Sequence, residues 1–138
     1  MASMKTYIAL LRGINVGGNH PLPMKELRQI LEQNGCADVQ TYVQSGNAVF
    51  RSAVSDPADL ATCVTSAVEK TRGFAPRVLV LTRGELERAA AGNPFPEADE
   101  NPKSVHLFFL VDRPKQPDLK SIESLKARTE GFALKGKT

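Results

Sequence analysis

The residues with the clearest chemical potential form a glycine-rich segment that begins at Arg12. Gly13, Gly17 and Gly18 follow this arginine and allow the backbone to take positive φ angles or to approach a ligand closely. The segment leads to the start of a predicted helix, where free backbone N–H groups and the helix dipole favour a negative charge. Together with the Arg12 guanidinium, this pattern predicts a site for a phosphate or a carboxylate.

Other features of the same segment point away from a nucleotide-binding loop. Pro21 and Pro23 each remove a backbone donor close to the helix start. The segment also matches neither the phosphate-binding P-loop pattern nor GxGxxG. An alternative interpretation is that the glycines only shape a turn and that Arg12 pairs with a carboxylate, and the sequence leaves both interpretations open.

A second group of polar residues occupies the turn of a predicted hairpin, Gln44-Ser45-Gly46-Asn47. Their amide and hydroxyl groups can both donate and accept hydrogen bonds, which suits them to a polar ligand. We expect this turn and the glycine-rich segment to lie at one end of a sheet. The expected ligand-binding residues are Arg12, Asn15, Gly17, Gly18, Asn19, Gln44, Ser45 and Asn47.

Two residues at this end could transfer a proton if the protein is an enzyme. His20 is the only histidine there, but it lies between Asn19 and Pro21 in a loop. Ser45 has no Asp and His pair nearby in the sequence, so a nucleophilic role would require partners that the sequence does not indicate. His106 lies in an apolar segment and is interpreted as structural. The residues predict no metal site and identify no cofactor or reaction.

The apolar periodicity predicts the elements that position these loops. In chain order they are a strand over 5–11, a helix over 23–35, a hairpin over 38–53, a helix over 57–73 and a strand over 78–81. This order, βαββαβ, is typical of an α+β ferredoxin-like sandwich with antiparallel strand order 4-1-3-2. Such a sheet brings three loops to one end: 12–20, 44–47 and 72–76, the last of which adds Arg72.

The remaining sequence predicts a second, partial unit. A capping box at Thr82 and Glu85 begins a short helix that runs to Gly92, and a proline-rich linker follows over 93–103. We expect residues 1–82 to form the ferredoxin-like unit and residues 83–138 to hold the helix, the linker and a related partial βαβ unit that is truncated at the C-terminus. The elements expected in that partial unit are a strand over 104–111, a helix after Asp118 and a strand over 132–134.

The composition indicates a cytoplasmic globular protein. No apolar run approaches the roughly 20 residues needed to span a bilayer, and the N-terminus lacks a signal-peptide pattern. Cys36 and Cys63 lack metal-ligand spacing and are both interpreted as packing residues. The net charge of +3 permits an anionic partner without requiring one, and the sequence does not indicate an oligomeric state.

The βαββαβ order also raises the question of RNA binding, because RNA-recognition modules stack bases on aromatic residues of their first and third strands. Tyr7 and Phe50 lie in roughly those strands, but the segment 45–51 lacks the diagnostic aromatic residues. Phe50 is therefore interpreted as a core residue. The basic residues near the C-terminus are interleaved with acidic ones, a pattern that a solvated face explains as well as a phosphate track does, so nucleic-acid binding is neither supported nor excluded.

Several of these residues also resemble one family. Ala9-Leu10-Leu11-Arg12-Gly13-Ile14-Asn15-Val16-Gly17-Gly18-Asn19, then Met24, Leu27 and Gln44-Ser45-Gly46-Asn47, are similar to the bacterial proteins grouped as domain of unknown function 1697. The resemblance implies no activity or catalytic residue, and longer members continue with a further basic segment. Three hypotheses therefore remain: a binding protein for a small anionic or nucleotide-like ligand, an enzyme acting at the same place, and a structural or protein-interaction module.

Overall fold

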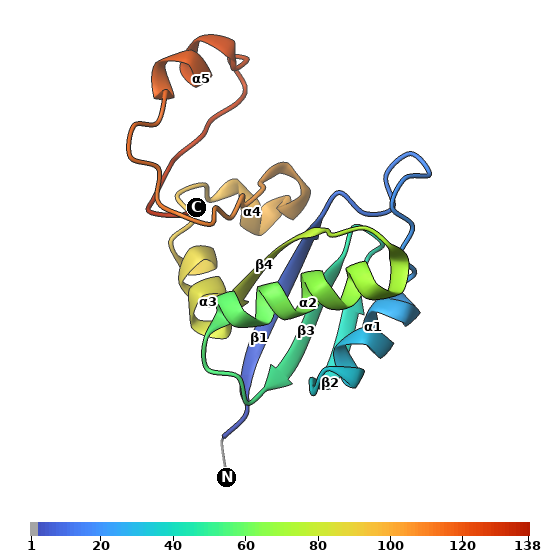
Figure 1. The fold of residues 1–138 in the computed structure, drawn as a ribbon. Helices are drawn as coiled ribbons and strands as arrows, with labels where there is room; N and C mark the ends of the chain where they lie inside the picture. The colour runs from blue at the N-terminus through green and yellow to red at the C-terminus, as the bar shows by residue number, and fades with distance from the viewer. Residues whose placement is uncertain (1–2) are drawn as a thin grey trace. The chain divides into compact units, whose positions relative to one another are not determined.

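The computed structural model describes residues 3–138, which divide into two compact units between Leu86 and Glu87. The first unit is an α+β arrangement whose strands and helices follow the predicted order (Figure 1). Its elements are β1 (Lys5–Arg12), α1 (Met24–Gln33), β2 (Ala37–Tyr42), β3 (Asn47–Ser52), α2 (Pro57–Arg72) and β4 (Arg77–Thr82).

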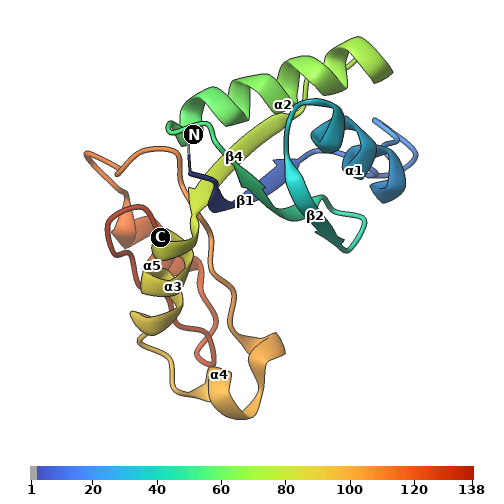
Figure 2. The ribbon, with the colours of Figure 1, turned by 90° about the horizontal axis from the view of Figure 1, so that it is seen from below.

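The four strands form one antiparallel sheet in the order β2-β3-β1-β4. Counted from the other edge, this is the predicted order 4-1-3-2, so the first strand in the sequence is central. Tyr7 on β1 lies opposite Phe50 on β3 and Thr82 on β4. Both α1 and α2 lie on one face of this sheet and contact each other (Figure 2).

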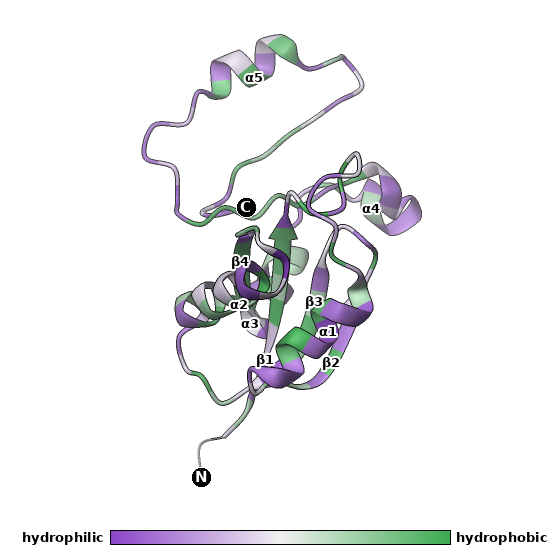
Figure 3. Cartoon of the chain, turned by 45° about the vertical axis from the view of Figure 1, so that its right-hand side comes forward, coloured by the Kyte–Doolittle hydropathy of each residue, from purple (hydrophilic) through white to green (hydrophobic). Residues whose placement is uncertain are grey.

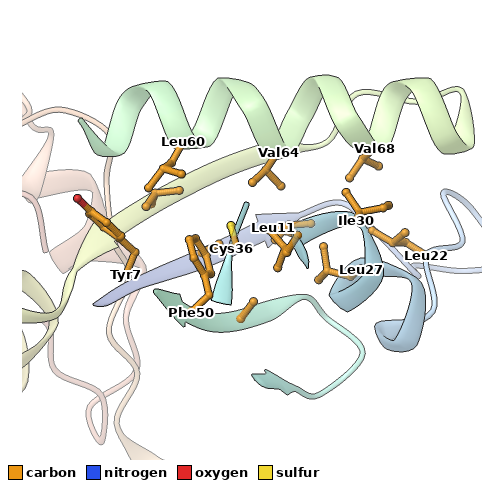
Figure 4. Packing of buried hydrophobic residues seen from close by; sticks show 14 of the residues in the cluster. Tyr7, Leu11, Leu22, Leu27, Ile30, Cys36, Phe50, Leu60, Val64 and Val68 are labelled. Atoms are coloured by element: carbon orange, nitrogen blue, oxygen red, sulfur yellow. The ribbon is translucent and has the colours of Figure 1, made fainter. Parts of the chain in front are cut away.

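The core fills the space between that face and the two helices (Figure 4). Strand side chains alternate between faces, so every second residue of β1 and β3 points to the helices. The strong hydrophobicity of β1 is visible in Figure 3. The buried side chains on the helix-covered side include Tyr7, Ala9, Leu11, Ala48 and Phe50 of the sheet, Leu27, Ile30 and Leu31 of α1, and Leu60, Val64 and Val68 of α2.

Phe50 is a core residue, as predicted, and so is Tyr7. Their exposed fractions are 0% and 1%, and the two rings pack against each other with centroids 6.3 Å apart. The Tyr7 hydroxyl donates a 2.6 Å hydrogen bond to the carbonyl of Val54, which satisfies its polar group. Neither aromatic ring is therefore available on the uncovered face of the sheet to stack on a base.

The two cysteines differ in their environments. Cys36 is buried in the core, and burial raises the pKa of its thiol to about 11, with a smaller contribution from the nearby Cys63. Cys63 is exposed on α2, where its Sγ lies 3.7 Å from Oδ1 of Asn34. The interpretation of Cys63 as a packing residue was wrong because this position lies outside the buried stripe of α2.

The second unit contains short helices: α4 (Glu97–Glu100), a 3₁₀ turn (Pro102–Ser104) and α5 (Leu119–Leu125), while α3 (Arg83–Ala91) spans the boundary between the units. The predicted capping box begins α3: the backbone N–H of Glu85 donates to Oγ1 of Thr82 at 3.1 Å. The helix predicted after Asp118 is also present, and the Asp118 carboxylate accepts from the Ser121 N–H.

The strands predicted over 104–111 and 132–134 are not formed, and the predicted linker instead contains α4. The segment 104–111 is apolar enough for a strand, but a strand also requires a partner for its backbone hydrogen bonds. Here Leu110 donates a single bond to the Lys137 carbonyl. Phe108 is 76% exposed, and no residue from 87 to 138 is buried.

Candidate functional site

The three loops expected at one end of the sheet do meet in the structure. Asn15, in the glycine-rich segment, donates from Nδ2 to the carbonyl of Gln44 in the hairpin turn at 2.7 Å. His20, in the same segment, stacks on Phe74 of the loop after α2, with ring centroids 4.5 Å apart. The glycine-rich segment is thus the element that joins the other two loops.

The glycine-rich segment forms a small hairpin of its own. The Asn15 N–H donates to the His20 carbonyl at 3.0 Å, and Val16 and Asn19 exchange backbone bonds of 3.3 and 2.9 Å. Gly17 and Gly18 occupy its tip with φ angles of +57° and +78°, as a type I′ turn requires. The glycines therefore shape a turn, which accounts for their presence without a bound anion.

Asn15 holds this hairpin against the rest of the loop end. In addition to the bond to Gln44, its Nδ2 donates to the Leu22 carbonyl at 2.8 Å, and its Oδ1 accepts from the Leu22 N–H at 2.7 Å. Leu22 is fully buried, so these bonds fix the point at which the chain enters the core before α1. The Asn15 side chain is fully engaged in holding the loops together.

The hairpin turn is closed by a second amide of the expected site, that of Asn47. Nδ2 of Asn47 donates to the Tyr42 carbonyl at 2.9 Å and contacts the Ser45 hydroxyl at 3.3 Å. Gly46 has a φ angle of +97° and its carbonyl accepts a 2.8 Å bond from the Leu11 N–H. Asn47 and Gly46 therefore attach the turn to β2 and β1.

The two candidates for proton transfer have structural partners. Nδ1 of His20 lies 3.0 Å from the Gly13 carbonyl, and its ring covers Phe74. Within residues 3–138, the Ser45 hydroxyl has a hydrogen bond only with Asn47, and no histidine or carboxylate activates it. The arrangement does not provide the nucleophile and base pair that acyl transfer needs.

Arg72 is committed to an ion pair with Glu26, which joins the end of α2 to the start of α1. Its Nε lies 2.9 Å from Oε1 of Glu26, and its Nη2 contacts Oε2. The hydrogen bond from Arg72 lowers the pKa of the Glu26 carboxyl group below its ordinary value. The charge of Arg72 is therefore neutralised locally.

This ion pair predicts a pH-dependent contribution to stability. Because the folded-state pKa of Glu26 is lowered, the contribution is present above the ordinary value of 4.5 and is lost as the pH falls through the folded-state pKa. We expect Glu26→Gln to lower the Tm at neutral pH and to have no effect once the carboxyl is protonated. Thermal melts of both proteins, from neutral pH down to a pH at which Glu26 is protonated, test the expectation.

The control for that series is Glu32→Gln, at an exposed position of α1 that has no ion pair within the described chain. Its Tm should follow the wild-type curve at every pH. A Glu26→Gln variant that also follows that curve would show that the ion pair contributes nothing measurable, as for many exposed pairs.

Arg12, unlike Arg72, has no carboxylate partner among residues 3–138. It is exposed at the last position of β1 and lies directly opposite Arg77, the exposed first residue of β4. Arg77 likewise forms no ion pair there. Sequence reasoning missed Arg77, although pairing the end of one strand with the start of its antiparallel neighbour would have indicated it.

The fold and these contacts define an α+β protein in which three loops meet at one end of a four-stranded antiparallel sheet, beside two exposed arginines. Residues 4–138 match the family described as protein of unknown function (DUF1697), and the chain belongs to that family. Comparison with curated proteins finds no match.

A solved structure, that of the conserved bacterial protein SP0830 from Streptococcus pneumoniae, is similar to this chain with a TM-score of 0.60 and 27% sequence identity. The similarity covers 88% of this chain and 65% of that one, so the chain spans less than two thirds of the length of this relative. In the part of the chain that the structure describes, no helix is long and apolar enough to cross a membrane.

Proposed function

We propose that this protein binds a small anionic ligand at the loop end of the sheet, with Arg12 as the principal charge. The observation that carries the proposal is the pairing of Arg12 with Arg77 across β1 and β4. Like charges directly opposite each other destabilise a sheet. An anion that accepts hydrogen bonds from both guanidinium groups removes that repulsion and makes strong, charge-assisted contacts.

The surrounding loops support the proposal in two ways. Asn15 and Asn47 hold the loops in place, whereas the side chains of Asn19 and Gln44 make no hydrogen bond within residues 3–138 and can turn to a ligand. Ser45 can donate its hydroxyl hydrogen. The backbone N–H groups of Gly17 and Gly18 lie at the tip of the small hairpin and are not used in its three cross-strand bonds.

We also propose that the first unit is a ferredoxin-like sandwich and that residues 83–138 contribute part of a related αβ unit. The strand order and the two helices on one face support the first statement. The helix α5 and the strand-forming composition of 104–111 support the second. A cytoplasmic location is proposed from the composition and the two free thiols.

The direct test is anion binding by the wild-type protein and by Arg12→Ala. A ligand at about 100 times its Kd adds about 2.7 kcal/mol of stability, so a thermal-shift screen with phosphate, carboxylates and nucleotides will reveal it. We expect Arg12→Ala to weaken binding by about tenfold or more, since hydrogen bonds to charged groups contribute about 1.5–3 kcal/mol. Isothermal titration calorimetry then measures the affinity.

Arg28→Ala is the matched control, because Arg28 is an exposed arginine on α1 without an ion pair in the described residues. It removes the same charge from the protein and should leave the affinity unchanged. Equal weakening by both substitutions would indicate only a general charge effect, and no anion binding by the wild-type protein would refute the proposal.

A further inference from the structure

The face of the sheet that α1 and α2 leave uncovered presents side chains in ordered rows. Tyr7, Ala9 and Leu11 belong to the core, so the alternating residues Leu10 and Arg12 point to the opposite face. The strand register places one row across the whole sheet. From β2 to β4 it consists of Tyr42, Asn47, Leu10 and Leu79.

This row lies next to the arginine pair. Arg12 follows Leu10 by two residues, and Arg77 precedes Leu79 by two residues, so the arginines project about 7 Å from the row on the same face. Within β1 and β4, the next side chains on this face are therefore the apolar Leu10 and Leu79. A ligand held by the arginines can place a planar ring on Leu10.

The adjacent row on this face, which contains Val49, Ile8 and Leu81, shows which part of the face is accessible to a ligand. Ile8 and Leu81 in that row are already buried, with exposed fractions of 7% and 5%. Val49 on β3, which is opposite Ile8, is 44% exposed, and Tyr42 at the β2 end is 76% exposed. The accessible part of this face therefore extends from the arginines across Leu10 towards Val49 and Tyr42.

The chemistry of that accessible part suits a planar, polar ring. An aromatic side chain such as Tyr42 can stack on a base, and such stacking contributes about 1–3 kcal/mol per base. Asn47 uses its Nδ2 within the hairpin, while its Oδ1 accepts no hydrogen bond within residues 3–138. The carboxylate of Asp38 lies at the far end of β2, where it pairs with Arg51 at 3.5 Å, so it does not neutralise the arginine pair.

We infer that this face binds a nucleotide, with its phosphate between Arg12 and Arg77 and its base over Leu10 and Asn47, next to Tyr42. The inference rests on the anion-binding function proposed above and names the class of ligand. The ribose spans the interval between the arginines and the leucine row. A free nucleotide is favoured over an RNA strand because Tyr7 and Phe50, on the two strands where RNA-recognition modules place stacking aromatics, are both buried in the core.

The experiment measures the affinity of the full chain for four kinds of ligand by isothermal titration calorimetry. These ligands are inorganic phosphate, each of the four common nucleoside monophosphates, the corresponding nucleosides and a short single-stranded RNA. We expect at least one monophosphate to bind about tenfold or more tightly than phosphate, since base stacking adds to the phosphate contact. The matching nucleoside should bind more weakly than its monophosphate.

Two substitutions separate the contacts. Arg77→Ala should weaken binding of both phosphate and the nucleotide by about tenfold. Tyr42→Ala should weaken nucleotide binding by about fivefold or more and leave phosphate binding unchanged, because only the base reaches this residue. Tyr42 is 76% exposed, so its removal leaves the core intact, and Arg28→Ala again serves as the charge control.

The outcomes distinguish this inference from the proposed function. Phosphate binding that depends on Arg12, with no gain for any nucleotide and no effect of Tyr42→Ala, would overturn the inference and retain the anion site. Nucleotide binding that is unchanged in Arg77→Ala would overturn the inference as well. Tight RNA binding with no affinity for the monophosphates would overturn the inference and indicate a nucleic acid as the ligand. If no anion binds, both the nucleotide inference and the proposed anion-binding function are refuted.

Discussion

Gly46→Ala is expected to lower the free energy of unfolding by about 2–5 kcal/mol, because it combines backbone strain with overpacking. The φ angle of Gly46 is +97°, a conformation that L side chains rarely adopt. An added Cβ would also lie 2.7 Å from Cδ1 of Ile14 and 2.9 Å from Cβ of Leu11. Both neighbours are buried, so neither can move away without disturbing the core. Denaturant unfolding followed by circular dichroism measures the loss.

Gly17→Ala is the matched control for this substitution. Gly17 also has a positive φ angle, +57°, but nothing lies within 4 Å of a Cβ built there. Its replacement should cost only the backbone strain, about 1–2 kcal/mol. If Gly46→Ala and Gly17→Ala destabilised the protein equally, the close packing of the hairpin turn against β1 would not be the reason that position 46 requires glycine.

Asn15→Ala is expected to lower the free energy of unfolding by about 2–4 kcal/mol. The substitution removes three hydrogen bonds at about 1 kcal/mol each and leaves two loops without their connection. It also places alanine at a φ angle of +53°, which asparagine tolerates better. The same denaturant titration measures this loss, and it should be accompanied by weaker anion binding because the loops are no longer held together.

Asn34→Ala provides the comparison for Asn15. Nδ2 of Asn34 makes one local bond, to the Ile30 carbonyl at the end of α1, and its Oδ1 has only the weak 3.7 Å contact with Sγ of Cys63. We expect a loss of about 1 kcal/mol there. A similar loss in the two variants would contradict the role of Asn15 as the connection between the glycine-rich segment and the hairpin turn.

The architecture of the first unit was predictable because its signals are local. Apolar alternation identifies strands, the spacing of Leu60, Val64 and Val68 identifies the buried stripe of α2, and Asp56 with Pro57 identifies its start. The Asp56 side chain indeed accepts from the Ala58 N–H at 2.9 Å. Strand order then followed from the βαββαβ sequence of elements.

The second unit was less predictable, because strand formation depends on partners that are distant in the sequence. The apolar segment 104–111 has the composition of a strand, yet its backbone has no neighbouring strand with which to form a ladder. By contrast, α3 and α5 were predicted well because a helix satisfies its backbone hydrogen bonds within its own segment.

The position of the candidate site was predictable from the sequence, but the hydrogen-bond and ion-pair partners of its residues were not. Topology correctly brought the three loops together, but it could not indicate that Asn15 is occupied with Leu22 and Gln44. Nor could it indicate that Arg72 turns to Glu26, since that contact depends on how α1 and α2 pack. Arg77 was missed because the end of β1 was not paired with the start of β4, although the predicted strand order made them neighbours.

The central position of β1 has a consequence for synthesis on the ribosome. This strand is made first, but its two neighbours, β3 and β4, begin at Asn47 and Arg77. At about 5–20 residues per second, the apolar β1 waits for several seconds before both of its edges are paired. During that interval the nascent chain exposes an unpaired apolar strand. We expect a chaperone at the ribosomal tunnel exit to bind it.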